Sequence, residues 1–277
     1  MSSDSPKTIS PMADASRKFE RVARLVGPSG FEKLREAHVL IVGLGGVGSW
    51  AAESLVRSGL GRITLIDFDR ICSVNFNRQI QALDGFIGES KAEVLTDRLK
   101  KINPEATFEV HAKFLNIENI DAMFSGKSDN GRPDFVIDAI DHVTSKCFLL
   151  DYCRRNSFPV VCSTGSGGRL DPTRIEVADL SETQVDPLAK TVRRVLRQKY
   201  GFQEKGEFGI PAVYSKEQPI VPCDLPNQDD FRCQCKYGVN DYQSCSKRNV
   251  VMGTAAFVTG AFGFACASLA VRYLLSK

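Results

Sequence analysis

A glycine-rich turn between a buried strand and a helix constrains this chain more than any other feature of its sequence. The segment His38–Gly43 is an almost continuous apolar run, as expected of a buried parallel strand, and a helical pattern follows from about Val47 to Ser58. Glycines in such a turn let backbone N–H groups approach a phosphate, and the helix N-terminus adds partial positive charge. The motif residues Gly43, Gly45, Gly46 and Gly48 therefore predict a nucleotide-phosphate site, although the motif alone does not choose the nucleotide.

Strand and helix patterns alternate over the next part of the chain, which predicts an α/β fold: a Rossmann-like, doubly wound, mostly parallel sheet. A change of pattern after residue 168 predicts a C-terminal extension whose strand can run antiparallel. The expected strands are Arg62–Asp67, Thr107–His111, Phe135–Asp138, Pro159–Cys162 and Arg174–Ala178. The expected helices are Lys18–Glu36, Ser90–Ile102, Thr144–Arg155 and Pro187–Tyr200.

The composition, with 43% hydrophobic and 25% charged residues, is ordinary for a globular protein with a sizeable core. We find no internal repeat and no domain boundary, so residues 17–277 are predicted to form one domain after a disordered, Ser- and Pro-rich tail at 1–16. A Cys- and Pro-rich stretch at about 202–248 is expected to be irregular. The net charge of +3 does not by itself indicate nucleic-acid binding.

Nine cysteines, an odd number scattered through the chain, do not form the dense framework of a small secreted domain. They favour a reducing compartment and a cytoplasmic location. No C-x-x-C pair occurs among four cysteines late in the chain, Cys223, Cys233, Cys235 and Cys245. Two interpretations therefore remain for them, a metal or redox site and free thiols.

The last helical segment, Val250–Val271, contains no charged residue and is long enough to cross a membrane. It is rich in Gly, Ala, Thr and Ser, which favours a buried core helix or a dimer-interface helix. We therefore expect no stable membrane insertion.

Polar side chains follow the predicted strands at the edge where a ligand of an open α/β sheet binds. Asp67 and Asp69, about 20 residues after the glycines, suit ribose hydroxyls. Lys91 opposes the helix dipole in the first turn of its helix, which favours a facing anion, so that Lys91 and Arg78 would clamp the β- and γ-phosphates. Asp141 is suited to Mg²⁺ on those phosphates. The alternatives are a solvated polar loop, an exposed lysine and, for Asp141, a helix N-cap.

The order of these residues resembles the E1-like adenylating family, which contains the ThiF, MoeB and HesA proteins and the core of ubiquitin-activating enzymes. The residues that carry the resemblance are the glycine turn, Asp67, Asp69, Asn75, Arg78, Gln79, Lys91 and Asp141. Further stretches resemble members that dehydrate a modified tRNA nucleoside: Ala23–Leu25, Gly45–Glu53, Asn77–Ile80, Asp138–Asp141, Tyr152–Asn156, Asp186–Ala189 and Phe262–Phe264.

The resemblance implies that Asp67 binds ribose, that Asn75, Arg78 and Lys91 bind the triphosphate, and that Asp141 binds Mg²⁺. It implies a homodimer in which Arg24 reaches the ATP of the partner subunit, and it leaves open a sulfur-acceptor protein as a partner. The implied substrate is the threonyl carboxylate of a carbamoylated adenosine in tRNA. The implied reaction is adenylation of that carboxylate by ATP, followed by intramolecular ring closure.

A basic stripe in the predicted helix Pro187–Tyr200 also favours a tRNA substrate. Lys190, Arg193, Arg194 and Arg197 recur at helical spacing and would neutralise backbone phosphates, whereas a solvated surface face is the alternative.

Three rival functions remain on the sequence alone. An E1-like enzyme that adenylates the C-terminus of a ubiquitin-like or sulfur-carrier protein predicts a thioester cysteine or paired C-x-x-C zinc ligands, and the sequence gives no clear case of either. A nicotinamide oxidoreductase would leave Arg78, Lys91 and Asp141 unexplained. A non-catalytic scaffold would not need the complete polar set.

Overall fold

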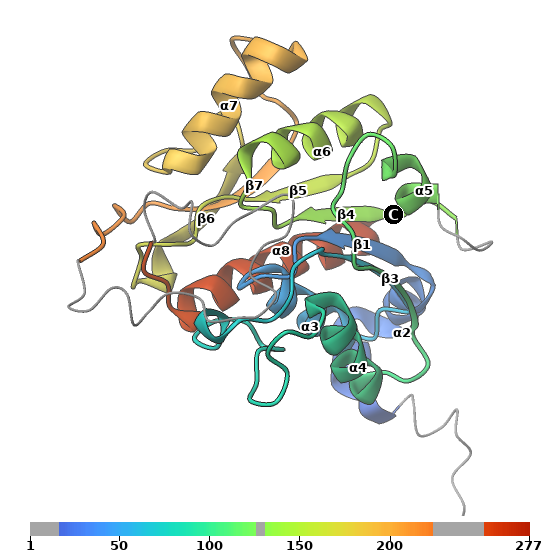
Figure 1. Ribbon diagram of the computed structural model, residues 1–277. Coiled ribbons are helices and arrows are strands. Elements are labelled where there is room, and N and C mark those ends of the chain that lie inside the picture. Colours follow the sequence, from blue (N-terminus) through green and yellow to red (C-terminus); the bar gives the residue numbers. More distant parts are fainter. Residues whose placement is uncertain (1–16, 126–130, 224–251) are drawn as a thin grey trace, which may run out of the picture.

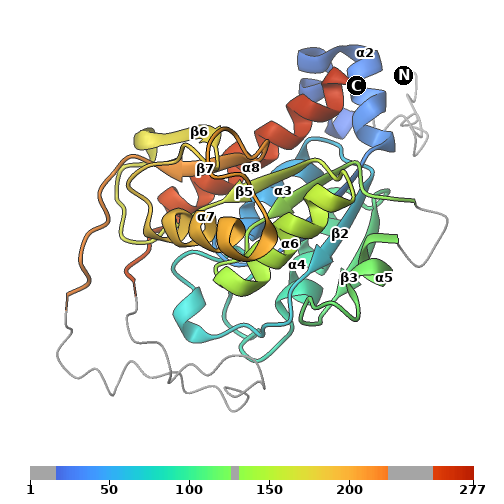
Figure 2. The ribbon, with the colours of Figure 1, turned by 90° about the horizontal axis from the view of Figure 1, so that it is seen from above.

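A computed structural model describes residues 17–125, 131–223 and 252–277, which build a single seven-stranded sheet between two layers of helices (Figures 1 and 2). The strand order is β3-β2-β1-β4-β5-β7-β6. The strands are β1 (His38–Val42), β2 (Arg62–Ile66), β3 (Thr107–His111), β4 (Phe135–Asp138), β5 (Val160–Ser163), β6 (Ile175–Asp179) and β7 (Pro211–Ser215). Six of these strands are parallel, and β6 pairs antiparallel with β7.

The helices divide between the two faces of the sheet. On one face lie α2 (Glu20–Glu36), α3 (Gly48–Arg57), α4 (Lys91–Ile102) and α8 (Ala256–Ser276). On the other lie α5 (Ile120–Ser125), α6 (Val143–Arg155) and α7 (Pro187–Tyr200). Two short 3₁₀ helices, η1 (Ser73–Asn75) and η2 (Pro172–Arg174), lie in the connections. This arrangement confirms the predicted doubly wound fold.

The chain reverses direction across the sheet between β1 and β4. From β1 it proceeds outward through β2 and β3, and it then returns to β4 on the other side of β1. In such sheets a ligand binds at the carboxyl ends of the strands where the order reverses. The topology therefore directs attention to the segments that follow β1 and β4.

Both faces of the sheet are buried, which explains why the central strands are apolar throughout. All five residues of β1 are buried, and its side chains alternate between two cores. Val39 and Ile41 pack with α3, α4 and α8, whereas Leu40 and Val42 pack with α6 and α7. Burial on both faces is typical of parallel sheets covered by helices.

Helix α8 packs closely along α3. A Cβ atom at Gly263 would lie 2.5 Å from the carbonyl oxygen of Val47 and 2.9 Å from Cβ of Trp50, so glycine permits the two backbones to approach. Phe262 and Cys266 of the same helix are fully buried. The helix is long and apolar enough to cross a membrane, but half of its apolar window is buried inside the protein. The predicted buried helix is confirmed in this respect.

Three details of the predicted elements were wrong. The stretch 202–248 was expected to be irregular, yet β7 lies within its described part, because Ala212–Ser215 is a short buried run whose neighbours β5 and β6 complete its pairing. Helix α5 was not predicted. The final helix begins at Ala256 and extends to Ser276, past the expected end at Val271, because its charged residue Arg272 lies on a partly exposed face.

Candidate active site

The glycine turn after β1 adopts a conformation that other residues could not adopt at two of its positions. Gly43 has φ of +90°, and a Cβ atom there would lie 2.7 Å from the carbonyl oxygen of Ala139. A Cβ atom at Gly48 would lie 1.8 Å from the carbonyl oxygen of Gly43. These two glycines close the turn, whereas Gly45 and Gly46 face side chains of the loop that follows β2.

The turn offers unpaired donors to a ligand. Among the described residues, the N–H groups of Gly45, Gly46 and Val47 find no main-chain acceptor. They lie directly before the N-terminus of α3, where the helix dipole adds positive potential. Such a group of N–H donors is suited to an anion, and to a phosphate in particular.

Asp67, predicted to bind ribose, holds the turn itself. Its Oδ2 atom accepts a hydrogen bond of 2.6 Å from the N–H of Leu44, and its Oδ1 atom accepts one of 2.8 Å from the N–H of Asp69. Burial raises the pKa of the Asp67 carboxyl above its ordinary value, against the opposing effect of Lys91. Each carboxylate oxygen retains a second acceptor position. Asp67 can therefore hold the turn and accept from a ribose hydroxyl at the same time, and the ribose contact stays a prediction.

Arg78 and Gln79 lie over the open side of the turn. A Cβ atom at Gly46 would lie 3.0 Å from Cγ of Arg78 and 3.1 Å from Oγ1 of Thr259, and one at Gly45 would lie 3.9 Å from Nε2 of Gln79. The main chain of Arg78 is fixed by Trp50, whose Nε1 donates to the Arg78 carbonyl at 3.0 Å. The buried Oε1 atom of Gln79 has no hydrogen-bond partner among the described residues.

Lys91 lies among three carboxylates at the carboxyl edge of the sheet. Its Nζ donates a hydrogen bond of 2.8 Å to Oδ2 of Asp69, and its side chain is almost fully buried. Burial alone would lower the pKa of Lys91, but the charges of Asp67, Asp69 and Asp141 raise it above its ordinary value. The ammonium group is thus charged and close to both Asp67, which holds the glycine turn, and Asp141.

Asp141 is exposed and is not the N-cap of α6. The cap is His142, whose Nδ1 accepts from the N–H of Ser145. The alternative explanation of Asp141 as a helix cap is therefore wrong by one residue, and its carboxylate remains available to a ligand. An exposed carboxylate near N–H donors that suit a phosphate fits Mg²⁺, which is commonly held by one or two carboxylates and phosphate oxygens.

Two further predicted residues have other contacts in the described chain. The Oδ1 atom of buried Asn75 accepts from the N–H of Cys72 at 3.0 Å and closes η1, so this acceptor supports the loop that carries Arg78. Arg24 lies on α2, where it pairs with Glu20 on the surface. Helix α2 packs near the end of α8, where Lys33 donates to the carbonyl of Leu275, so Arg24 is not brought to the glycine turn of its own chain.

A buried ion pair lies behind the site and was not predicted. Nζ of Lys146 lies 2.6 Å from Oδ2 of Asp138 and 2.8 Å from the carbonyl oxygen of Ser163, and neither charged side chain is exposed. Oδ1 of Asp138 accepts from the N–H of Ile140, which shapes the turn leading to Asp141. No sequence pattern predicts that Lys146 is buried in an ion pair, because its partner Asp138 lies on a strand and not on the same helix.

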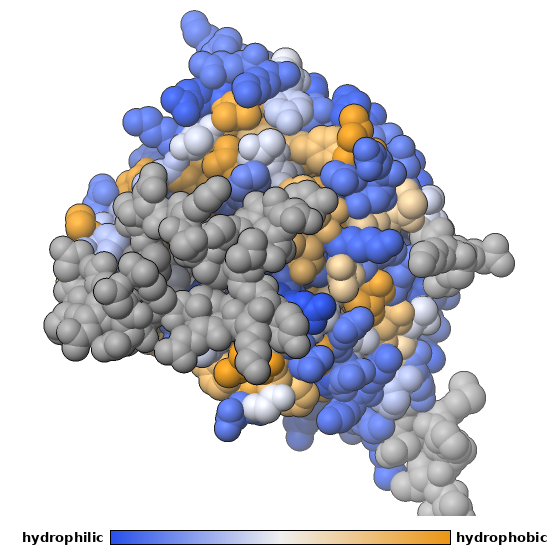
Figure 3. Space-filling view, in the orientation of Figure 1, coloured by the Kyte–Doolittle hydropathy of each residue, from blue (hydrophilic) through white to orange (hydrophobic). Residues whose placement is uncertain are grey.

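The four basic residues of α7 separate into two pairs. Lys190 and Arg194 are exposed. The surface over α7, at the top of Figure 3, is largely hydrophilic. Arg193 is half-buried and donates to Oγ1 of Thr183, and Arg197 lies over the ring of Phe208 and donates to the carbonyl of Gln203. The exposed pair is free to contact a polyanion, whereas the other pair supports the fold.

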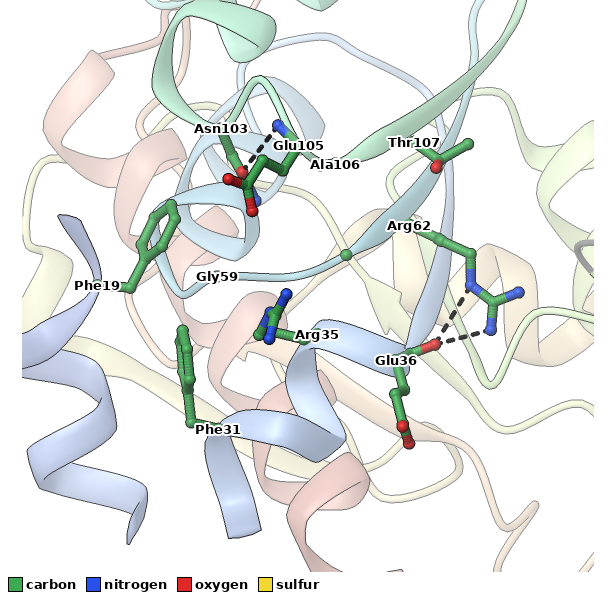
Figure 4. Close-up of a pocket in the computed structure, with 11 residues that line it drawn as sticks. Phe19, Phe31, Arg35, Glu36, Gly59, Arg62, Asn103, Glu105, Ala106 and Thr107 are labelled. Carbon is green, nitrogen blue, oxygen red and sulfur yellow. Dashed lines mark hydrogen bonds between the residues drawn. The ribbon is translucent and has the colours of Figure 1, made fainter. Parts of the chain in front are cut away.

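A cavity of about 430 Å³ lies at the opposite edge of the sheet, where β2 and β3 begin. Figure 4 shows the rings of Phe19 and Phe31 on one side of it, with Arg35, Asn103 and Thr107 around the remainder. Because the glycine turn follows the end of β1, this cavity is not part of the candidate site. Of the four thiols considered for a metal, Cys223 is exposed and free, and the other three lie outside the described residues. No group of three or more metal-ligating side chains occurs within the described ranges.

The chain belongs to the ThiF family, whose sequence pattern matches residues 17–277. Several similar relatives within this family share one name. The tRNA threonylcarbamoyladenosine dehydratase of Haemophilus influenzae is 42% identical over 265 residues, which covers 94% of both chains. The protein of the same name from Escherichia coli is 40% identical over 272 residues, covering 96% of this chain and 97% of the relative. The crystal structure of the Escherichia coli enzyme in complex with ATP matches with a TM-score of 0.81 and 38% identity over 97% of each chain.

Proposed function

We propose that this protein is an ATP-dependent dehydratase that converts N6-threonylcarbamoyladenosine in tRNA to its cyclic form. The observation that carries the proposal is the convergence of donors on the glycine turn. The N–H groups of Gly45, Gly46 and Val47 lack main-chain acceptors, and the side chain of Arg78 lies over Gly46. The near full-length similarity to dehydratases supports the choice of substrate.

In the proposed reaction, a threonyl carboxylate oxygen attacks the α-phosphorus of ATP. The bond to the bridging oxygen breaks, pyrophosphate leaves, and an acyl-adenylate forms. The neighbouring carbamoyl group then attacks the activated carbonyl, loses a proton and expels AMP as the ring closes. The substrate loses the elements of water, and its carboxylate oxygen leaves on AMP. Ring closure is intramolecular, so proximity supplies much of the rate.

We assign the electrostatic part of the reaction to Arg78, Lys91 and Asp141. The first two would balance the charge that develops on departing pyrophosphate, and the low solvent exposure of Lys91 strengthens its effect. Asp141 would hold Mg²⁺, which when bound neutralises phosphate charge. Asp67 and Asp69 would contact the ribose, with Asn75 and Gln79 next to the phosphates.

The proposal extends to the partners of the enzyme. We place tRNA along α7 at Lys190 and Arg194. We also propose a homodimer in which Arg24, whose side chain is 71% exposed, reaches the nucleotide of the partner subunit. A cytoplasmic location suits a tRNA substrate, and a sulfur-acceptor protein stays a candidate partner.

The decisive experiment incubates the full chain with ATP, Mg²⁺ and tRNA carrying threonylcarbamoyladenosine, and then measures the mass of the nucleoside. A loss of about 18 Da is expected for activation and ring closure. Arg78→Ala and Asp141→Ala should abolish this loss while the thermal unfolding transition is retained. Lys100→Ala, an exposed change on α4, is the control. Pyrophosphate exchange driven by a ubiquitin-like protein but not by modified tRNA would overturn the proposal.

A further inference from the structure

A second glycine-rich turn, Gly165–Gly168, lies at the same edge of the sheet as the nucleotide turn. It follows β5, and β4 and β5 are parallel neighbours in which Asp138 pairs with Cys162. The turn after β5 therefore emerges beside the segment that leads from Asp138 to Asp141. No predicted site residue lies in it.

Two consecutive residues before α8 connect this turn to the loop that carries Arg78. The carbonyl of Gly253 accepts from the N–H of Gly168 at 2.7 Å, and the carbonyl of Thr254 accepts from Nδ2 of Asn77 at 2.9 Å. Because neighbouring Cα atoms are about 3.8 Å apart, Gly168 and the residue preceding Arg78 are held close together.

A buried ion pair fixes the underside of the turn. The guanidinium of Arg169 donates to the carbonyls of Gly165 and Gly167 and to Oδ2 of Asp186. Asp186 also accepts from the N–H of Gly165 at 2.9 Å and caps α7 through the N–H of Ala189 at 2.7 Å. Neither Arg169 nor Asp186 has a side chain more than 1% exposed, and the Nε atom of Arg169 has no partner among the described residues.

These contacts determine where the N–H groups of the turn point. In a trans peptide the C=O and the following N–H point in opposite directions. The carbonyls of Gly165 and Gly167 face Arg169, so the N–H groups of Ser166 and Gly168 face away from it. That of Gly168 reaches Gly253, whereas that of Ser166 finds no main-chain acceptor among the described residues. Ser166 is only half-buried, so its donor, directed away from Arg169, is accessible to a ligand.

We propose that the Gly165–Gly168 turn is the subsite for the carboxylate of the acyl substrate, an inference that rests on the proposed function. The N–H of Ser166 donates to the carboxylate, whose free oxygen then faces the nucleotide. The Arg169–Asp186 pair orients the turn. Because the charges of this pair cancel, it adds no net positive charge that would bind the substrate carboxylate too tightly for it to react. Because Asp186 also caps α7, the first turn of the proposed tRNA helix is held in a fixed position relative to this subsite.

The test compares Ser166→Glu with Ser166→Gln in the full chain, since the two variants differ in charge and hardly in size. A carboxylate placed at the subsite competes with that of the substrate. We expect kcat/KM for modified tRNA to be at least about tenfold lower for S166E than for S166Q, with a smaller change in the ATP dissociation constant. The shorter pair Ser166→Asp and Ser166→Asn replaces the first pair if S166E does not fold.

Equal kcat/KM values for the charged and neutral variants would overturn the subsite. A larger loss in ATP affinity than in kcat/KM would also overturn it, because the turn would then belong to the nucleotide site. A wild-type chain that never dehydrates modified tRNA would instead refute the proposed function, so the two failures are distinguishable.

Discussion

The Nε2 atom of Gln81 lies 2.7 Å from the main-chain carbonyl oxygen of Leu44, to which it donates a hydrogen bond inside the glycine turn. The N–H of the same leucine is held by Asp67. Because the carbonyl of Leu44 faces Gln81, the N–H of Gly45 on the same peptide faces the opposite side, where we place the phosphates. Gln81 is thus a positioning residue of the turn, and only 1% of its surface is exposed.

Replacing Gln81 by Leu should weaken ATP binding. The variant leaves the carbonyl of Leu44 without its donor, and a lost hydrogen bond of about 1–2 kcal/mol corresponds to a roughly 5- to 30-fold higher dissociation constant. Calorimetric titration with ATP measures this effect. Gln198→Leu, the same change at an exposed position of α7, is the matched control. Equal affinities of the two variants would show that the turn keeps its form without Gln81.

The close contact of α8 with α3 predicts opposite effects of two alanine substitutions in one helix. Gly263→Ala should lower the free energy of unfolding by about 1–3 kcal/mol, because the added methyl group meets the carbonyl of Val47. Gly260→Ala should be neutral or stabilising by up to about 1 kcal/mol, since its nearest neighbour is the Trp50 ring at 3.6 Å and alanine favours helix. Urea denaturation of both variants measures the difference. Equal unfolding free energies would contradict the packing.

The two pairs of basic residues on α7 should separate binding from stability. Removing Lys190 and Arg194 together should weaken tRNA binding and reduce the slope of log affinity against log salt by about 2, with unchanged unfolding. Removing Arg193 and Arg197 should lower the free energy of unfolding by about 1–2 kcal/mol, because their contacts lie within the chain. Filter binding over a salt series and urea denaturation distinguish the two effects.

A salt slope reduced equally by both pairs would contradict this separation. The whole stripe would then contact phosphate, as the sequence pattern alone suggested.

His38 should make stability depend on pH in the mildly acidic range. Burial, and next the charge of Arg62, lowers the pKa of this histidine, and its Nε2 lies 2.8 Å from Oγ1 of Thr64. The unfolded chain therefore binds a proton more readily than the fold. The contribution to stability is complete above about pH 6.5 and is lost as the pH falls from there through the lowered pKa. Urea denaturation at about pH 7.5 and about pH 5.5 should show a smaller decrease for His38→Gln than for the wild type. A decrease of equal size would exclude His38 as its source.

Most of the fold could be predicted because local patterns agree with it. The strand Thr107–His111 and the helix Pro187–Tyr200 have the predicted bounds, the latter because Asp186 caps it and proline begins it. Strand β7 could not be predicted, since it is short and its neighbours β5 and β6 lie far away in the sequence. The kink at Gly27, directly before Pro28, was likewise not predicted by the helical pattern of α2.

The residues of the candidate site could be named from the sequence where they belong to contiguous motifs, as with Gly43, Arg78 and Lys91. The residues that support it could not. Gln81, Lys146 and Arg169 act through main-chain groups or partners that the sequence does not place nearby. A buried lysine or arginine becomes recognisable only when its partner is known, and both pairs found here join different elements of the fold.

The packing of α3 against α8 also has a consequence for folding during synthesis on the ribosome. The helix that begins at the glycine turn is covered by the last helix of the chain, from which it is separated by most of the sequence. During synthesis the first strands emerge early, yet α3 lacks its covering layer until Ala256–Ser276 leave the ribosome. A nascent chain should therefore acquire its nucleotide affinity in one step, only once α8 has left the ribosome.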